Sequence, residues 1–443
     1  MKIGIDKFNG DKPIDNCIDF EFEGKFPCDA GFAIGEFLNS DLYQYVDSKL
    51  EDNFIYPVTV KCFANSIGLS IDELWKFNTE DLILDLVDTR KTFLDVIPNN
   101  VLNKLRSGKS KLLLNYGFEE YSARLKDTVL YLEQYLVYHL ERIGIDPTNV
   151  WYTDSNYQLD VIHSWKNDEE INESDRLHSI NCFSQNFTAN SFMYERDIWK
   201  LTPDQIENKK NQKLTKKYIC YNRLYKDHRK KLVDWLLEKQ YVKDGYVSFP
   251  PDLTLDYTNF DDNWAYFPIN HNHYNSSFFS IVTESNFRFD IRIKDTVDEE
   301  GNPTEHGSYV SSGAVESRYL TEKTWKPIFN LHPVVILGAP ESIRYLSERG
   351  FDVFPEYFGG VDAQGVPSAP CHKYDGQHHG NLRFDNLCNV LDDFLKDNTI
   401  KQLEKLRKDI FPRLLDNYNN FWGDFTSFVK NDFYIKLQKT MGD

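Results

Sequence analysis

The sequence predicts an α/β protein that is built from two domains with parallel sheets. From residue 111 onward, short apolar runs of strand length alternate with segments whose apolar residues recur at helical spacing. A polar stretch, residues 201–210, interrupts this alternation before it resumes. With 443 residues, of which 41% are apolar and 15% aromatic, the chain has enough core material for two domains.

We expect two Rossmann-like domains that face a cleft, with extra helices at the N-terminus. The first domain is predicted over residues 1–205 and the second over residues 206–425, because Pro203 and its charged neighbours are typical of a linker. Residues 426–443 are expected to form a C-terminal helix that packs back on the first domain. Open parallel sheets bind ligands at the carboxyl ends of their strands, so the ligand site is expected there.

In the first domain, residues 111–115 and 149–153 have the length and apolar character of buried strands. Between them, apolar residues recur at helical spacing over residues 125–143. This β-α-β pattern predicts parallel strands with a right-handed crossover. Nearer the N-terminus, helices are expected at residues 37–50 and 70–77 and a strand at residues 57–62.

The second domain repeats the alternation. Its apolar runs are rich in Val, Ile and aromatic residues, as buried parallel strands are. The expected strands are residues 217–221, 278–282, 334–337 and 351–354, and the expected helices are residues 229–239, 322–330, 340–349, 391–415 and 417–429.

Charge and cysteine content narrow the classes of function. The net charge of -18 gives a field that repels polyanions at long range, which disfavours a general nucleic-acid coat or a binder of anionic membranes. The seven cysteines form no Cys-x-x-Cys pair and indicate free thiols in a reducing compartment. Since no run of about 18 apolar residues is present, we expect a cytoplasmic protein without a membrane span.

Neither the histidines nor the acidic pairs predict a metal site. The acidic residues at 85–88 and 261–262 lack an Asp-x-Asp in an obvious strand-end loop. Imidazoles in polar Gly- and Asn-rich loops are more often solvated than metal-bound. The histidines considered are His271, His273, His372, His378 and His379.

Residues 317–328 carry the strongest chemical signal. Thr321 is expected at the N-cap of a helix, where unpaired backbone N–H groups and the helix dipole favour an anion. Lys323 adds a charge suited to a diphosphate, and Glu322 can accept hydrogen bonds from two hydroxyls of a ribose or sugar. The same residues also fit a capped amphipathic helix with a solvated charge pair.

A second signal is a basic segment with ten Lys and Arg residues against one Asp, between residues 209 and 231. Arg223 and Arg229 come after a predicted strand and after Asn222, and either guanidinium could bind a phosphate. A solvated helix face explains part of the same charge.

These segments resemble the donor-binding signature of the α1,3-fucosyltransferases. The run Tyr319-Leu-Thr-Glu-Lys323, followed by residues 333–340 with a Pro-x-x-x-x-Gly-x-Pro pattern, is similar to the signature itself. Glu284 and Ser285 match the end of an upstream strand in that family. The resemblance covers residues 215–355, but a polar insert at residues 293–317 separates the motifs more widely than in the family. The same segments also resemble glycosyltransferase-like proteins of bacteriophages and marine viruses, which would place the chain in the host cytoplasm.

The resemblance implies a GT-B glycosyltransferase that moves a sugar from a nucleotide diphosphate sugar, with inversion, to a glycan or small hydroxylated acceptor. It implies no metal and no tightly bound cofactor. Three alternatives stay open: a catalytically idle protein that binds a nucleotide or glycan, a glycosyltransferase acting on a base of viral DNA, and a virion or scaffold component that binds no nucleotide. The donor-binding residues carried by these motifs are Asn222, Arg223, Arg229, Glu284, Tyr319, Thr321, Glu322 and Lys323.

Such a transfer needs a general base within reach of the acceptor hydroxyl. Glu119 is the favoured candidate, with Glu120 beside it, because both follow the strand at 111–115 at its carboxyl end. Asp154, after the strand at 149–153, is the alternative. An acid in the first turn of the next helix would also suit the helix dipole without any catalytic role.

Overall fold

The computed structural model describes residues 2–5, 7–9, 12–19, 24–28, 44–60, 97–116, 137, 140–141, 143–154, 178–180, 199–222, 225–249, 253, 270–284, 287, 291–292, 309–310, 320–359, 372–377, 379–429, 431 and 435. The chain divides into two compact units. Unit 1 comprises residues 1–195 with 427–443, and unit 2 comprises residues 196–426. The sequence prediction placed the corresponding boundaries after residues 205 and 425.

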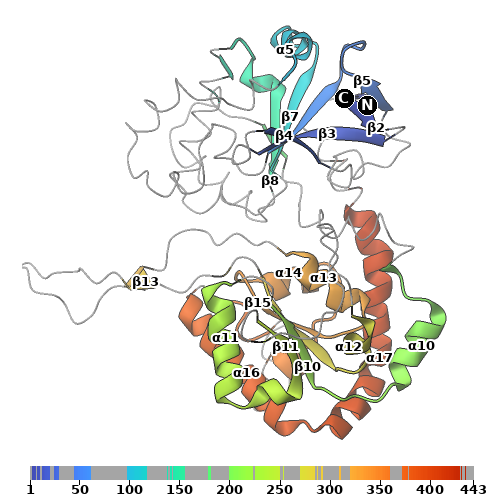
Figure 1. Cartoon of the computed structure of the whole chain (residues 1–443), viewed down its shortest axis with the longest axis vertical. Helices are drawn as coiled ribbons and strands as arrows, with labels where there is room; N and C mark the ends of the chain where they lie inside the picture. Colours follow the sequence, from blue (N-terminus) through green and yellow to red (C-terminus); the bar gives the residue numbers. More distant parts are fainter. Residues whose placement is uncertain are drawn as a thin grey trace, which may run out of the picture. The chain divides into compact units, whose positions relative to one another are not determined.

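The described part of unit 1 forms a nine-stranded sheet with a parallel centre (Figure 1). The central strands, in spatial order, are β6 (Ile55–Val60), β7 (Lys111–Tyr116), β8 (Val150–Asp154) and β9 (His178–Ile180). Strand β3 (Lys12–Asp19) runs parallel to β6. It also pairs antiparallel with β2 (Lys7–Asn9) and β4 (Gly24–Cys28). Strand β1 (Lys2–Ile5) runs parallel to both β5 (Gln44–Asp47) and β6.

The centre of this sheet is apolar on both faces. Leu112, Leu113 and Leu114 of β7 are fully buried, as expected of a parallel strand covered on both sides. Helix α5 (Asn99–Arg106) crosses from β6 to β7 and buries Val101 and Leu105. A 3₁₀ turn, η4 (Pro147–Asn149), is capped by Asp146 and leads into β8.

The predicted strands at 57–62, 111–115 and 149–153 are confirmed as β6, β7 and β8, with small shifts at their ends. The helix predicted at 37–50 is wrong over residues 44–47, which form β5. Residues Tyr45 and Val46 favour strands, and β1 pairs with all four residues of β5, so tertiary pairing decided the structure. The described residues before position 61 form strands and turns, and the helix predicted at 70–77 lies outside the described residues.

Unit 2 is an α/β unit with a four-stranded sheet, in which every described pairing is parallel. The spatial order is β11 (Gly245–Ser248), β10 (Tyr218–Tyr221), β12 (Phe279–Thr283) and β15 (Val334–Leu337). Because β10 comes first along the chain and β11 second, the direction of winding reverses between β10 and β12. Such a reversal is the point at which Rossmann-like sheets bind ligands.

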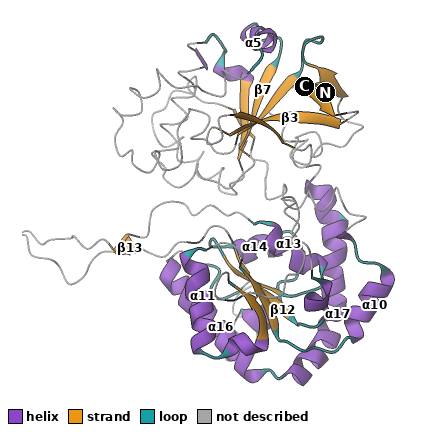
Figure 2. Cartoon of the chain, in the orientation of Figure 1, coloured by secondary structure: helices purple, strands orange, loops and turns teal. Residues whose placement is uncertain are grey.

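Helices cover both faces of the unit 2 sheet (Figure 2). Trp325 of α13 is fully buried, with its ring 5.9 Å from that of Phe421 and 5.1 Å from that of Phe425. This aromatic cluster fixes α13 against α17 and so fixes the N-terminus of α13 at the carboxyl edge of the sheet. The helices of this unit are α10 (Pro203–Asn211), α11 (Asp227–Glu238), α12 (His271–Asn275), α13 (Glu322–Phe329), α14 (Ser342–Glu348), α15 (Pro355–Phe358), α16 (Gly380–Asp397) and α17 (Ile400–Trp422).

The strands predicted at 217–221, 278–282 and 334–337 are confirmed as β10, β12 and β15, whereas β11 was not predicted. The final strand predicted at 351–354 is wrong. Phe354 has a left-handed backbone, with φ of 55°, and the Asn417 side chain binds both the N–H and the carbonyl of Asp352. These bonds replace the strand pairing that the apolar sequence suggested.

The predicted linker at 201–210 is also wrong, because residues 203–211 form α10. Pro203 occupies the first turn, which suits its fixed φ and missing N–H. Thr202 and Gln205 form a capping box, in which each side chain binds the other residue's backbone N–H. The proline therefore begins a helix here.

The predicted helix at 391–415 is two helices, because α16 ends at Asp397 and α17 begins at Ile400. A second capping box, between Thr399 and Gln402, starts α17. Among the described helices, none is long and apolar enough to cross a membrane.

Lys209 of α10 is 1% exposed, and its ammonium donates to the carbonyl of Tyr274 at 3.1 Å. The ring of His332 also donates to that oxygen, at 2.6 Å. Burial, followed by the charge of Arg407, holds the pKa of Lys209 well below its ordinary value. The folded protein therefore resists the protonated form of this amine.

We expect Lys209→Met to stabilise unit 2 by about 1 kcal/mol or more at neutral pH. Among the described residues no acid acts on the Lys209 amine, and a buried amine in such surroundings costs more than a packed thioether. The His332 bond keeps the Tyr274 carbonyl satisfied in the variant. Urea unfolding at neutral pH measures the change, with Lys213→Met, at an exposed position, as control. A Lys209→Met protein less stable than the parent would contradict this account.

Candidate functional site

The carboxyl ends of β10 and β12 meet at the reversal point of the unit 2 sheet. Asn222 follows β10, and Glu284 follows β12. The two strand ends are joined by the Thr283 hydroxyl, which donates to the Asn222 side-chain oxygen at 2.6 Å. Two residues predicted to bind a donor thus lie at the edge where a Rossmann-like sheet binds its ligand.

Asn222 is 2% exposed and links the ends of β10, β11 and β12 by hydrogen bonds. Its backbone N–H donates to the Ser248 hydroxyl and its side-chain amide donates to the Ser248 carbonyl, both at 3.1 Å. The Ser248 hydroxyl donates in return to the Asn222 carbonyl at 3.2 Å. Both ends of the Asn222 side chain are therefore engaged by β11 and β12, so this residue positions the edge.

Glu284 is fully buried and binds the start of α13. Its carboxylate accepts from the Thr321 N–H at 2.9 Å, from the Thr321 hydroxyl at 2.7 Å and from the Thr324 hydroxyl at 2.6 Å. Gly338, at the end of β15, makes room for this carboxylate, because a Cβ there would lie 3.1 Å from the Glu284 Cβ. A glycine in the 333–340 motif thus serves the packing of Glu284.

The predicted N-cap of α13 is confirmed, since the Thr321 hydroxyl accepts from the Lys323 N–H at 3.3 Å. Two of the backbone N–H groups at this helix start, where unpaired groups were expected, have partners: the Thr321 N–H donates to Glu284 and the Lys323 N–H donates to the Thr321 hydroxyl. The Glu284 carboxylate also supplies the negative charge that the helix dipole favours.

A second buried carboxylate occupies the start of α14. Asp375 is 1% exposed and accepts from the N–H groups of Ile343 at 3.0 Å and Arg344 at 2.8 Å. By contrast, no side chain caps the N-terminus of α11, which follows β10. Of these three helices that begin at the carboxyl edge, α11 is the one that no described side chain caps, and its first turn carries the exposed acid Asp227.

Basic side chains gather round the start of α11. His228 is 3% exposed and its Nε2 donates to the Glu284 carbonyl at 2.9 Å. Burial lowers the pKa of His228 to about 3, and the charges of Arg229, Lys226 and Lys323 act in the same direction. His228 is therefore neutral and lies among three cations that come from two separate segments.

Arg229 and Lys323 differ in their access to a ligand. Arg229 is 2% exposed and donates to the Thr283 carbonyl at 3.3 Å. The Lys323 side chain is 26% exposed, and its ammonium lies 3.2 Å from the Glu322 carboxylate. Burial raises the pKa of Glu322, but the charges of Lys323 and Lys326 outweigh burial and lower it. The Glu322 carboxylate is thus held in its ionised form beside the partly buried Lys323 ammonium.

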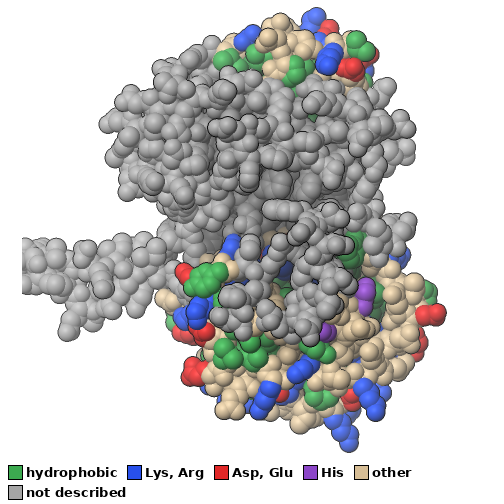
Figure 3. Space-filling view, in the orientation of Figure 1, with side chains coloured by type: hydrophobic (Ala, Val, Ile, Leu, Met, Phe, Trp, Pro, Cys, Tyr) green, Lys and Arg blue, Asp and Glu red, His purple; other side chains and the backbone are tan. Residues whose placement is uncertain are grey.

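The basic segment at 209–231 does not gather into one patch. Lys209 and Arg229 are buried, Lys230 pairs with Asp234 on the same helix, and Lys217 pairs with Asp244. On the face of unit 2 seen in Figure 3, basic and acidic side chains are interspersed. The alternative interpretation, a solvated helix face, accounts for Lys230.

Three predicted residues, Arg223, Tyr319 and Glu119, lie outside the described residues, as does Glu120. Asp154 is the last residue of β8.

Two of the histidines considered as ligands have other partners, and His378 lies outside the described residues. His273 accepts from the Tyr221 hydroxyl at 2.6 Å and stacks on Tyr246, and His372 is buried. The described Cys, His, Asp and Glu residues include no group of three that could hold a metal ion.

The site could have been found in part from sequence. Strand-end polar residues point to Asn222 and Glu284, but the buried position of His228 and the role of Asp375 carry no local signal.

Comparison of the chain with protein families, curated proteins and solved structures found no match.

Proposed function

We propose that the chain is a glycosyltransferase that uses a nucleotide diphosphate sugar, with unit 2 as its donor-binding domain. The observation that supports this most is the meeting of β10, β12, α11 and α13 at one carboxyl edge, together with the cations Lys226, Arg229 and Lys323. Rossmann-like sheets bind nucleotides at this position.

In this proposal the diphosphate lies at the start of α11. The backbone N–H groups at the start of that helix donate hydrogen bonds to the phosphate oxygens, and Lys323 supplies a positive charge from the neighbouring helix. Glu284 and Asn222 act indirectly, because they hold the ends of β10, β12 and α13 in place.

The proposed chemistry is a single displacement. A base of unit 1, for which we keep Glu119, takes the proton of an acceptor hydroxyl. The hydroxyl oxygen bonds to the anomeric carbon, with inversion, while the bond from that carbon to the diphosphate breaks. The cations at the α11 edge stabilise the charge on the departing diphosphate. Units 1 and 2 would then be the two domains of a GT-B enzyme, and the acceptor would be a glycan or small hydroxylated molecule.

Thermal unfolding with UDP, GDP, CMP, TDP and their sugars tests the proposal. We expect one nucleotide to raise the melting temperature, since a ligand at roughly a hundredfold above its Kd stabilises by about 2.7 kcal/mol. Lys323→Ala should weaken that nucleotide by about tenfold, as a lost charge-assisted bond does. Lys401→Ala, an exposed lysine on α17, is the matched control and should bind normally.

The results separate three outcomes. Binding with sugar transfer to an acceptor supports the enzyme. Binding without hydrolysis or transfer of any donor sugar would favour the idle binding protein. A folded sample that none of the nucleotides stabilises would rule out the donor site at this edge.

A further inference from the structure

Unit 2 has a groove of about 520 Å³ that lies away from the carboxyl edge of its sheet. Three helices line it: α15 contributes Glu356 and Tyr357, while α16 and α17 form its two walls. Phe358 and Phe394 beneath it contact Phe279, which begins β12, so the groove lies toward the amino ends of the strands. It is therefore distinct from the carboxyl edge that the proposed donor site uses.

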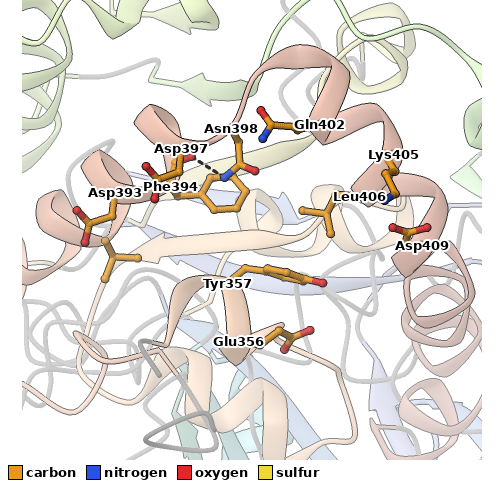
Figure 4. A pocket seen from close by; sticks show the side chains of 11 residues that line it. Glu356, Tyr357, Asp393, Phe394, Asp397, Asn398, Gln402, Lys405, Leu406 and Asp409 are labelled. Atoms are coloured by element: carbon orange, nitrogen blue, oxygen red, sulfur yellow. Dashed lines mark hydrogen bonds between the residues drawn. The ribbon is translucent and has the colours of Figure 1, made fainter. Parts of the chain in front are cut away.

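The groove has an apolar floor. Phe394 is 6% exposed, and Val390, Leu406 and the ring of Tyr357 lie beside it. Figure 4 shows the rings of Tyr357 and Phe394 and the Leu406 side chain along the middle of the groove. Such a floor suits a hydrocarbon chain, and the faces of its aromatic rings suit a cation.

The rim is acidic. Four carboxylates line the groove, from Glu356, Asp393, Asp397 and Asp409, against one ammonium, from Lys405. In Figure 4, Asp393 and Asp397 lie at one end and Asp409 with Lys405 at the other. The lining thus carries excess negative charge at the Asp393–Asp397 end of the apolar strip, whereas Lys405 offsets Asp409 at the other end.

Part of this negative charge has no ion-pair partner within the described structure. Glu356 is bound by Arg413, but none of the described basic residues forms an ion pair with Asp393, Asp397 or Asp409. Lys396 lies near two of these acids, because its hydrogen bond with Asp392 and then the charges of Asp393 and Asp397 raise its pKa. Burial raises the pKa of Tyr357, and the charges of Glu356 and Asp409 raise it further while that of Arg413 lowers it, so groups of both signs lie near its hydroxyl.

The spacing of Asp393 and Asp397 favours an elongated cation over a compact metal ion. Asp393 and Asp397 are one turn apart on α16, a rise of about 6 Å, close to the distance between the nitrogens of an extended four-carbon diamine. Among the described acids, no three converge as metal ligands would. An elongated cation with a hydrocarbon body matches both the separated charges and the apolar floor.

From this match of shape and charge we propose that the α15–α16–α17 groove binds an aliphatic polyamine, with ammonium groups on Asp393, Asp397 and Asp409 and methylene groups on Tyr357, Leu406 and Phe394. The site is independent of the proposed transferase activity. A polyamine bound there would bridge three helices and stabilise unit 2.

Titration calorimetry of the full chain with spermidine and with putrescine, at low salt, tests this proposal. We expect saturable binding, stronger for spermidine. Asp393→Asn/Asp397→Asn should weaken spermidine by about tenfold, as the loss of two part-exposed charge pairs predicts. The matched control, Asp385→Asn/Asp416→Asn, removes the same charge from exposed positions of α16 and α17 outside the groove and should leave the affinity unchanged.

Three results would overturn the proposal. The first is the lack of saturable spermidine binding at millimolar concentration. The second is an equal loss of affinity in both double variants, which would show attraction to net charge alone. The third is displacement of spermidine by Mg²⁺ at equal ionic strength, which would show a site for a compact ion. Melting temperatures of both variants without ligand verify that each is folded.

Discussion

Glu284→Ala is expected to destabilise unit 2 by about 3 to 5 kcal/mol, a large part of the stability of an ordinary domain. The substitution removes a fully buried carboxylate and leaves the Thr321 N–H and two threonine hydroxyls without their acceptor. It also removes the negative charge at the start of α13. Urea unfolding followed by tryptophan fluorescence, to which the buried Trp325 of α13 contributes, measures the loss.

A milder variant keeps this prediction testable if Glu284→Ala does not fold. Glu284→Gln retains the shape and one oxygen, so we expect a smaller loss than for alanine. The Thr324 hydroxyl donates to Glu284, and Thr324→Val removes this bond. In the Thr324→Val background, Glu284→Gln should therefore reduce the free energy of unfolding by less than it does in the parent. Glu238→Ala, an exposed acid on α11, is the control.

This experiment also separates two roles for Glu284. A residue that contacts only the donor would leave the stability of the unliganded protein unchanged and would reduce only the nucleotide-dependent shift. Loss of stability without ligand identifies the positioning role that the hydrogen bonds indicate. A stability loss below about 1 kcal/mol for Glu284→Ala would contradict that role.

Sequence predicted the strands well where burial is complete. The runs at 334–337 and 112–114 are apolar on both faces, and a parallel strand covered by helices has that composition whatever its neighbours are. The misassigned residues 44–47 and 351–354 are short segments whose structure depends on a partner. Residues 44–47 pair with β1, and residue 352 binds Asn417, which lies 65 positions away.

Two helix boundaries could have been predicted from local sequence. Thr202 with Gln205 and Thr399 with Gln402 are both capping boxes, and such pairs mark helix starts before any fold is known. The chemistry of the edge is different. Glu284 and Thr321 are 37 positions apart, so the sequence shows an acid and an N-cap but not that one binds the other.

The consequence for the site is that two motif residues have structural partners. Thr321 and Glu284 satisfy each other. In the proposed function Lys323 and the start of α11 bind the ligand, although the Lys323 ammonium also contacts the Glu322 carboxylate and the Thr321 hydroxyl. A sequence motif selects residues that must be present together, and some of them are present because the fold of the site needs them.

Lowering the pH from about 7 to about 4.5 is expected to destabilise unit 2, with His372 alone contributing about 2 kcal/mol. His372 is 1% exposed, and its Nε2 donates to the Val353 carbonyl at 2.7 Å. The Ile336 N–H donates to the Tyr374 hydroxyl at 3.0 Å, and that hydroxyl donates to Nδ1 of His372 at 2.8 Å. A proton on Nδ1 of His372 would repel the hydroxyl proton of Tyr374. The Tyr374 hydroxyl would then have to turn, which would disturb the hydrogen bond that it accepts from Ile336 of β15.

Burial lowers the pKa of His372 from 6.5 to about 4, while the Val353 bond acts in the opposite direction. Because the folded pKa is the lower one, the unfolded chain binds more protons between these two values. The stability is therefore complete above about pH 6.5 and is lost as the pH falls toward about 4. Burial shifts the pKa values of His228 and His332 in the same direction, so their losses add.

Urea unfolding of the parent and of His372→Gln, each at about pH 7 and about pH 4.5, isolates this contribution. Glutamine does not titrate, so the difference between the two pH values should be smaller in the variant by about 2 kcal/mol, even if the variant is less stable at both. His379→Gln, at an exposed position in the same segment, controls for the substitution. If His372→Gln keeps the full pH dependence of the parent, the acid sensitivity arises elsewhere and the Ile336–Tyr374–His372 chain does not oppose protonation.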